Sequence, residues 1–220
     1  MMERKELPFE FVPTEQEGEF EGYASRFNNL DDVGDIIVPG AFKHSLPEFV
    51  GQGFIAGLNH DWDHPIGRPV EAREDTKGLW IRALLSDTAS SRDCRTLMQD
   101  GVVSHLSIGF QTLSKRLLGD QGAVRAYWQS VRYTPQPDEL ERAKQGVRLI
   151  TSARLIEVSP VTVPANRLAQ ITGVKSERGE IATEREFERF LREAGGFSRR
   201  KATAITLYGF KAIVSSSSFV

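Results

Sequence analysis

Short apolar segments separated by glycine and proline dominate the chain between residues 20 and 174. These segments are rich in β-branched and aromatic residues, which suit the pleated surface of a strand. Only two helical patterns lie between them, so the pattern predicts an α+β core that is mostly β. The predicted strands are Glu19–Phe27, Gly53–Leu58, Leu79–Leu85, His105–Leu113, Val147–Ser152 and Leu155–Val163.

Two helices are predicted within this core. Thr88 is a suitable N-cap for a helix in which Cys94 and Met98 share one apolar stripe. Residues 138–145 resemble a short charged helix. The preceding region, 119–137, contains scattered glycine, glutamine and proline, and we expect it to form a long mobile excursion.

The character of the sequence changes near its end. Apolar residues recur at helical spacing from Phe187 to Ala194, and Ser198 is a suitable cap for a second, basic helix. Two such helices are too small to bury their own apolar stripes well, so we expect them to dock on the core or on a partner. The predicted parts are a main domain, residues 1–175, and a helical tail, residues 176–220.

Composition narrows the class of function. The formal net charge of −2 provides no basic face to displace counterions from phosphates, so nucleic acid is not an expected partner. The single cysteine, Cys94, excludes an intramolecular disulfide and a multi-cysteine zinc site. No apolar run approaches the length of about 20 residues that crosses a bilayer, and the charged start lacks the apolar centre of a signal peptide. We expect a soluble protein of a reducing cytoplasm, without membrane contact.

The strand around Ser107 is a candidate site for chemistry. Because side chains alternate along a strand, Ser107 and Gly109 lie opposite the apolar side chains of Leu106 and Ile108. A solvent-facing serine without a catalytic role is the common interpretation of such a residue. Gly109 has no side chain, so it leaves room on the same face for another backbone to approach.

His60 lies in the motif GLNHDWDH, where the chain leaves an apolar segment. A serine hydroxyl is a poor nucleophile at neutral pH, whereas an imidazole with a pKa of about 6.5 can take its proton and return it to a leaving amine. His60 and Ser107 are therefore a candidate general base and nucleophile, provided that the fold brings them together. A purely structural hydrogen bond is the alternative role for such a histidine.

A third polar group is needed to orient the base and to stabilise its imidazolium form. Glu157 interrupts an otherwise apolar strand, and a buried acid needs a partner that offsets its desolvation. A salt bridge to Arg154 is the structural alternative for Glu157. His105 and Asp61 are the substitutes for the third position.

The segment from His60 to His64 has a rival interpretation as a metal site. It holds two imidazoles and two carboxylates in five residues, which can bind a divalent metal. A catalytic metal needs further ligands, and the other histidines, His44 and His105, come without a carboxylate cluster. We therefore expect no metal and no cofactor, with a metal-dependent hydrolase as an alternative.

Four blocks of sequence occur in order between residues 20 and 175: FEGYASRFNNLDDVGDIIVPGAFKHSL, LNHDWDHPIGR, LMQDGVVSHLSIGF and LIEVSPVTVPANRLAQI. Together they resemble the prohead maturation protease family of tailed phages, which is related in fold to the herpesvirus assembly proteases. By this resemblance the catalytic pair is the histidine of the second block, His60, and the serine of the third, Ser107. Herpesvirus members use a second histidine after the serine. No histidine follows Ser107 here, which favours Glu157 as the third residue.

The resemblance also implies a fold and a function. The fold would be a small, mostly antiparallel β-barrel surrounded by helices, with the C-terminal helical hairpin as a tail that targets the capsid or is cleaved off. The activity would be that of a serine endopeptidase whose substrates are the major capsid protein, the scaffold protein and the protease itself. It would act inside the assembling procapsid in the host bacterial cytoplasm, as a homodimer in some relatives. A non-enzymatic capsid assembly factor of the same fold is the alternative.

Overall fold

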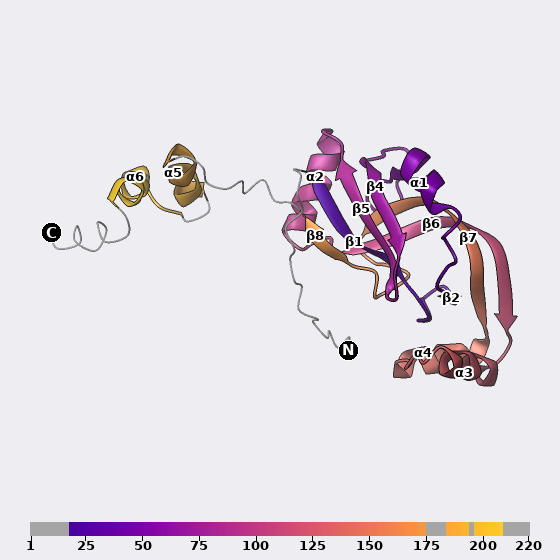
Figure 1. Cartoon of the computed structure of the whole chain (residues 1–220). Helices are drawn as coiled ribbons and strands as arrows, with labels where there is room; N and C mark the ends of the chain where they lie inside the picture. Colours follow the sequence, from indigo (N-terminus) through magenta and orange to yellow (C-terminus); the bar gives the residue numbers. More distant parts are fainter. Residues whose placement is uncertain (1–17, 175–183, 194–195, 209–220) are drawn as a thin grey trace. The chain divides into compact units, whose positions relative to one another are not determined.

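A computed structural model describes residues 18–174, 184–193 and 196–208. Contacts divide the chain into two compact units, Met1–Lys175 and Ser176–Val220. Within the described residues, the first unit holds all the strands and four α-helices, and the second holds two further helices (Figure 1).

The first unit is built mainly from strands. Its strands are β1 (Glu19–Arg26), β2 (Asp35–Ile37), β3 (Phe54–Ile55), β4 (Gly67–Glu74), β5 (Gly78–Leu85), β6 (His105–Leu118), β7 (Val147–Val161) and β8 (Ile171–Val174). Its helices are α1 (Leu46–Gln52), α2 (Ala89–Gln99), α3 (Gln121–Ser130) and α4 (Pro137–Arg142), and a 3₁₀ turn (Ala143–Gln145) follows α4.

The strands form one open, mixed sheet. They are hydrogen-bonded in the order β2-β7-β3-β4-β5-β1-β8, and β6 pairs with the other edge of β7. β2 and β3 run parallel to β7, whereas the other pairs are antiparallel. An isolated bridge joins His105 of β6 to Gln170, just before β8. The described strands form no continuous ladder between β6 and β8, so the fold is α+β and sheet-rich, and the closed barrel that the resemblance implies is not shown.

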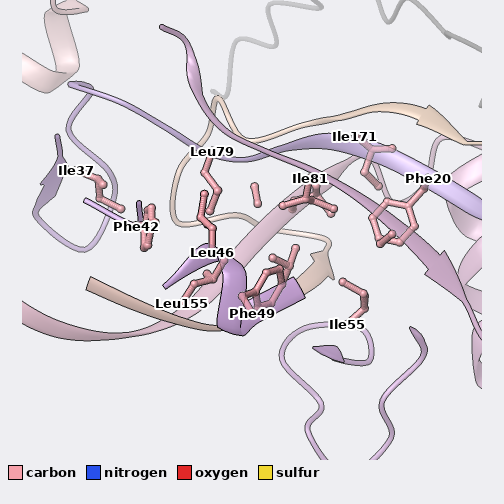
Figure 2. Close-up of a cluster of buried hydrophobic side chains, with 14 of the residues drawn as sticks. Phe20, Ile37, Phe42, Leu46, Phe49, Ile55, Leu79, Ile81, Leu155 and Ile171 are labelled. Atoms are coloured by element: carbon pink, nitrogen blue, oxygen red, sulfur yellow. The ribbon is translucent and has the colours of Figure 1, made fainter. Parts of the chain in front are cut away.

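One apolar core lies against this sheet and α1 (Figure 2). β5 shows how the sequence produces it: Leu79, Ile81 and Ala83 alternate with other residues, and all three are fully buried. Burial of a leucine- or isoleucine-sized side chain contributes about 1.5–3 kcal/mol relative to exposure. Phe20, from β1, and Phe49, from α1, fill the same core.

β6 and β7 form a long antiparallel pair of 14 and 15 residues that extends to α3 and α4 (Figure 1). A second apolar cluster lies at that end, where Val124 and Trp128 of α3 pack on Leu30 and Ile36. The mobile excursion predicted for residues 119–137 is therefore wrong, because most of it is the ordered helix α3. Its apolar stripe is short, and two of its packing partners, Leu30 and Ile36, come from a distant part of the chain.

Several predicted elements are confirmed. β1, β5 and α2 lie where expected, and Thr88 caps α2 by accepting a hydrogen bond from the backbone of Ser91. The two strands predicted at 147–152 and 155–163 are instead the continuous strand β7. α1 and β4 were not predicted. β4 reads GRPVEARE, and because Pro69 is its one buried residue, it lacks a marked apolar pattern.

The second unit consists of α5 (Glu184–Glu193) and α6 (Arg199–Tyr208), which confirms the two predicted helices. Leu191, Ala202 and Ile205 form a small buried cluster between them. The role of this tail stays a prediction. Among the described residues, none of the helices has both the length and the apolar character needed to cross a membrane.

Candidate active site

β6 and β7 place four candidate residues on a two-by-two grid. Ser107 lies directly across from Ser159, and Gly109 lies directly across from Glu157. Within each strand the two residues are two positions apart, so their side chains lie on the same face of the sheet. The register between the strands therefore brings Glu157 next to β6, the strand that carries Ser107.

His60 lies in the turn after β3, with its backbone in the left-handed region at φ +64°, next to Asn59 at φ +59°. This conformation is uncommon for residues other than glycine, and asparagine tolerates it better than most. The turn is tied to β7, because the Asn59 N–H donates to the Pro160 carbonyl over 2.9 Å and the Asn59 side chain accepts from the Thr162 N–H over 3.0 Å. This turn thus directs the His60 ring toward Ser107 and Glu157.

Three predicted residues form a continuous hydrogen-bonded chain. His60 Nε2 is 2.9 Å from Ser107 Oγ, and His60 Nδ1 is 2.8 Å from Glu157 Oε1. The Glu157 side chain is fully buried, whereas the His60 side chain is 41% exposed. The carboxylate is therefore shielded from water, while the imidazole borders the solvent from which a substrate would arrive.

The Glu157 carboxylate decides which form of the His60 ring is present. The hydrogen bond that His60 donates to Glu157 raises the pKa of His60 above its ordinary value, burial opposes this increase, and the charge of Glu157 adds to it. Because an ionised carboxylate only accepts hydrogen bonds, Nδ1 carries the hydrogen in that bond. In the neutral ring, Nε2 is then free to accept the proton of the Ser107 hydroxyl.

Ser159 completes this constellation and was not among the residues predicted from the sequence. Its hydroxyl is fully buried, donates to Glu157 Oε2, and lies 3.2 Å from His60 Nδ1. Its position two residues after Glu157 in one strand was the available signal, because that spacing puts both side chains on one face.

Gly109 is a steric requirement of the site. A Cβ built there would lie 2.5 Å from Glu157 Oε1, and Glu157 Cγ would lie 3.0 Å away. Gly109 was expected to leave room for another backbone. Instead, the group that approaches it is the Glu157 carboxylate.

The salt bridge from Arg154 to Glu157, which was the structural alternative, is not formed. Arg154 forms an ion pair with Glu48 rather than with Glu157. His105 is the first of the two substitutes for the third position. Its Nδ1 is 3.1 Å from the Ser104 hydroxyl, and burial lowers the pKa of His105.

The second substitute, Asp61, pairs with His64 over 2.9 Å at the surface. Both ring nitrogens of His60 are directed to Glu157 and Ser107, so His60 and His64 do not converge on one point. Within residues 18–174, 184–193 and 196–208, no three His, Cys, Asp or Glu side chains gather as metal ligands.

Comparison with known proteins shows the family to which this chain is similar. The family model described as caudovirus prohead serine protease matches residues 5–184. The chain belongs to this family. It is 31% identical over 221 residues to the prohead protease of Enterobacteria phage HK97, covering 97% of this chain and 84% of that protein. It is 28% identical over 165 residues to the prohead protease of Escherichia phage T5, covering 74% of this chain and 66% of that protein.

Family membership makes this chain a serine protease, and the predicted family is confirmed. The hydrolase class of the prediction is confirmed with it, and the relationship to herpesvirus assembly proteases stays a prediction. The family's name specifies a serine enzyme of the prohead, which favours this reading of the protease over a metal-dependent hydrolase and over an assembly factor without activity.

Proposed function

We propose that this protease cleaves the major capsid protein, the scaffold protein and itself inside the assembling procapsid, with Ser107 as nucleophile, His60 as general base and Glu157 as the residue that orients His60. The observation that carries the proposal is the unbroken hydrogen-bonded chain from Glu157 through His60 to Ser107. The names of the two relatives, both prohead proteases, support the prohead as the place of action.

The acylation step follows from the protonation states of Ser107, His60 and Glu157. His60 Nε2 removes the proton of Ser107 Oγ as the oxygen attacks the carbonyl carbon of the scissile peptide bond. Glu157 accepts a hydrogen bond from Nδ1–H, without taking the proton, and stabilises the imidazolium that forms. His60 then transfers the proton to the departing amine nitrogen, the C–N bond breaks, and an acyl ester remains on Ser107.

Deacylation uses the same groups in reverse. His60 Nε2 takes a proton from a water molecule, whose oxygen attacks the ester carbonyl. The C–O bond to Ser107 breaks and the proton returns to Ser107 Oγ, which regenerates the enzyme and releases a carboxylic acid. The 41% exposure of the His60 side chain supports access of water and substrate to this face.

The decisive experiment is co-expression of the protease with its cognate capsid and scaffold proteins, comparing wild type with Ser107→Ala by intact-mass spectrometry of every species. Truncated products that disappear in the variant support the proposal, and their masses identify the cleavage sites. Ser107→Ala removes one oxygen and no apolar packing, so the fold should be retained. Equal, uncut masses in both samples would contradict it.

A chelator separates the metal alternative in the same experiment. Cleavage that persists in Ser107→Ala but stops when a chelator is added would favour a metal-dependent hydrolase based on His60 and His64. The proposal expects chelation to have no effect on the wild-type products.

A further inference from the structure

Ser159 is the one hydroxyl that contacts both Glu157 and His60 among the described hydrogen bonds. It lies on β7 directly across from Ser107 and is fully buried. A buried serine needs a partner for its hydrogen, and here the partner is the second oxygen of the buried carboxylate. Ser159 therefore belongs to the same polar network as the candidate catalytic chain.

The Glu157 carboxylate has two oxygens to satisfy, and its side chain is fully buried. Oε1 accepts from His60 and Oε2 accepts from Ser159. A buried ionised carboxylate is costly unless its oxygens are hydrogen-bonded, and leaving one oxygen unpaired costs more than the bond itself contributes. Without Ser159, Oε2 would lose this partner.

The hydroxyl also limits where the ring can lie. Ser159 Oγ is 3.2 Å from His60 Nδ1, close enough to accept part of the Nδ1 hydrogen that points to Glu157. One hydroxyl can donate a hydrogen and accept another at the same time. The Nδ1 hydrogen is thus held between two oxygens, which restricts rotation of the ring away from Ser107.

We propose that Ser159 is a positioning residue of this protease: it fixes the Glu157 carboxylate and the His60 tautomer so that Nε2 faces the Ser107 hydroxyl. This inference rests on the proposed function of the other three residues. Ser159 acts through Glu157 and His60 and takes no part in bond formation.

Of the charged and titratable groups near His60, Glu157 is the one that also contacts Ser159. Glu157 reaches the ring from β7, and on the turn of His60 itself Asp61 is paired with His64. His105 of β6 is engaged in a separate hydrogen bond. Loss of the Ser159 hydroxyl would destabilise the bare carboxylate most when His60 is neutral, so the apparent pKa of the His60–Glu157 pair should rise.

The test uses the full-length protease and a fluorophosphonate probe, which reacts with an activated serine and needs no knowledge of the natural substrate. The rate of modification of Ser107, read by intact mass, is measured across the pH range in which histidine titrates. Ser159→Ala is compared with wild type and with Ser91→Ala. Ser91 is a matched control, since it is also a buried serine, but its hydroxyl bonds to the Ile66 carbonyl.

We expect Ser159→Ala to react about tenfold more slowly at neutral pH, with the midpoint of the pH profile about one unit higher. Ser91→Ala should match wild type in both. If Ser159→Ala does not fold, Ser159→Cys keeps the volume and supplies a weak S–H donor, so its rate should fall between those of serine and alanine. A wild-type rate and midpoint in Ser159→Ala or in Ser159→Cys would overturn the inference.

Failure of the proposed function would look different. In that case the probe would not modify Ser107 of the wild type, or it would modify Ser107 equally fast in His60→Ala. Modification that depends on His60 but not on Ser159 would retain the proposed function and remove only the positioning role.

Discussion

Two histidines four residues apart, His60 and His64, each pair with a carboxylate, and the two contacts are almost the same length. His60 Nδ1 is 2.8 Å from Glu157, and His64 Nδ1 is 2.9 Å from Asp61. Their surroundings differ, because the Glu157 side chain is fully buried whereas Asp61 and His64 are 43% and 71% exposed.

The difference shows that burial and a third partner, rather than contact distance, decide what such a pair can do. Water screens an exposed pair, so it contributes little to stability and holds neither side chain in one place. The buried carboxylate holds the Nδ1 side of His60, and Ser107 lies at the Nε2 side. We therefore expect only the His60 pair to respond strongly to substitution.

The largest difference should come from the two histidines. His60→Ala should lower kcat by about 10⁵-fold or more, because it removes the base that activates Ser107. His64→Ala should change kcat by less than about twofold, since surface pairs contribute little. The measurement is the initial rate of cleavage of purified scaffold protein. Equal losses in both variants would mean that the exposed pair shares in the chemistry.

The next largest difference should come from the two carboxylates. Glu157→Gln should lower kcat by about 10³- to 10⁴-fold, because an amide can hold His60 in the wrong tautomer. Asp61→Asn, the matched change in the exposed pair, should leave kcat nearly unchanged. If Glu157→Gln only lowers the thermal midpoint of unfolding while the rate is preserved, Glu157 is a structural acid and the third residue lies elsewhere.

A smaller effect on kcat is expected from Gly109→Ala. This change moves the buried Glu157 carboxylate without altering its chemistry, so it tests the position of the carboxylate alone. The new Cβ would lie 2.5 Å from Glu157 Oε1 and must displace it. A displacement of this size can lower kcat by about 10- to 100-fold. Gly119→Ala is the control, since a Cβ there meets nothing within 4 Å. Full activity in Gly109→Ala would show that Glu157 tolerates displacement.

The smallest effect concerns pH. The pKa of His60 is raised above 6.5 by the hydrogen bond to Glu157, so the ring stays protonated, and inactive as a base, to a higher pH. The kcat/KM of the wild type should therefore rise with pH through a midpoint above 6.5. The residual activity of Glu157→Gln should show a lower midpoint, and Asp61→Asn should show the wild-type one. A midpoint that does not respond to Glu157→Gln would remove Glu157 as the cause.

Local sequence accounts for much of the fold and for the candidate residues. The cap at Thr88 and the strands β1 and β5 are visible from local spacing, because capping and side-chain alternation depend on neighbouring residues. The sequence pattern also made Ser107 a candidate nucleophile, and the family resemblance assigned it that role.

Long-range packing accounts for what local patterns missed. Helix α3 was predicted as a mobile excursion because its partners, Leu30 and Ile36, lie about ninety residues earlier and bury it only in the folded state. The predicted barrel is not shown for a similar reason: the described strands form an open sheet, and closure of a sheet depends on which distant strands pair.

By itself the sequence determined which face of each strand Ser107, Gly109, Glu157 and Ser159 occupy, because alternation is built into the backbone. Only the tertiary structure decided that these faces coincide, through the register of β6 and β7. It also decided that His60, 97 residues from Glu157, is the histidine that reaches the site, while His64 stays at the surface. The physical reason is that register and burial arise from contacts between distant segments, which no local pattern encodes.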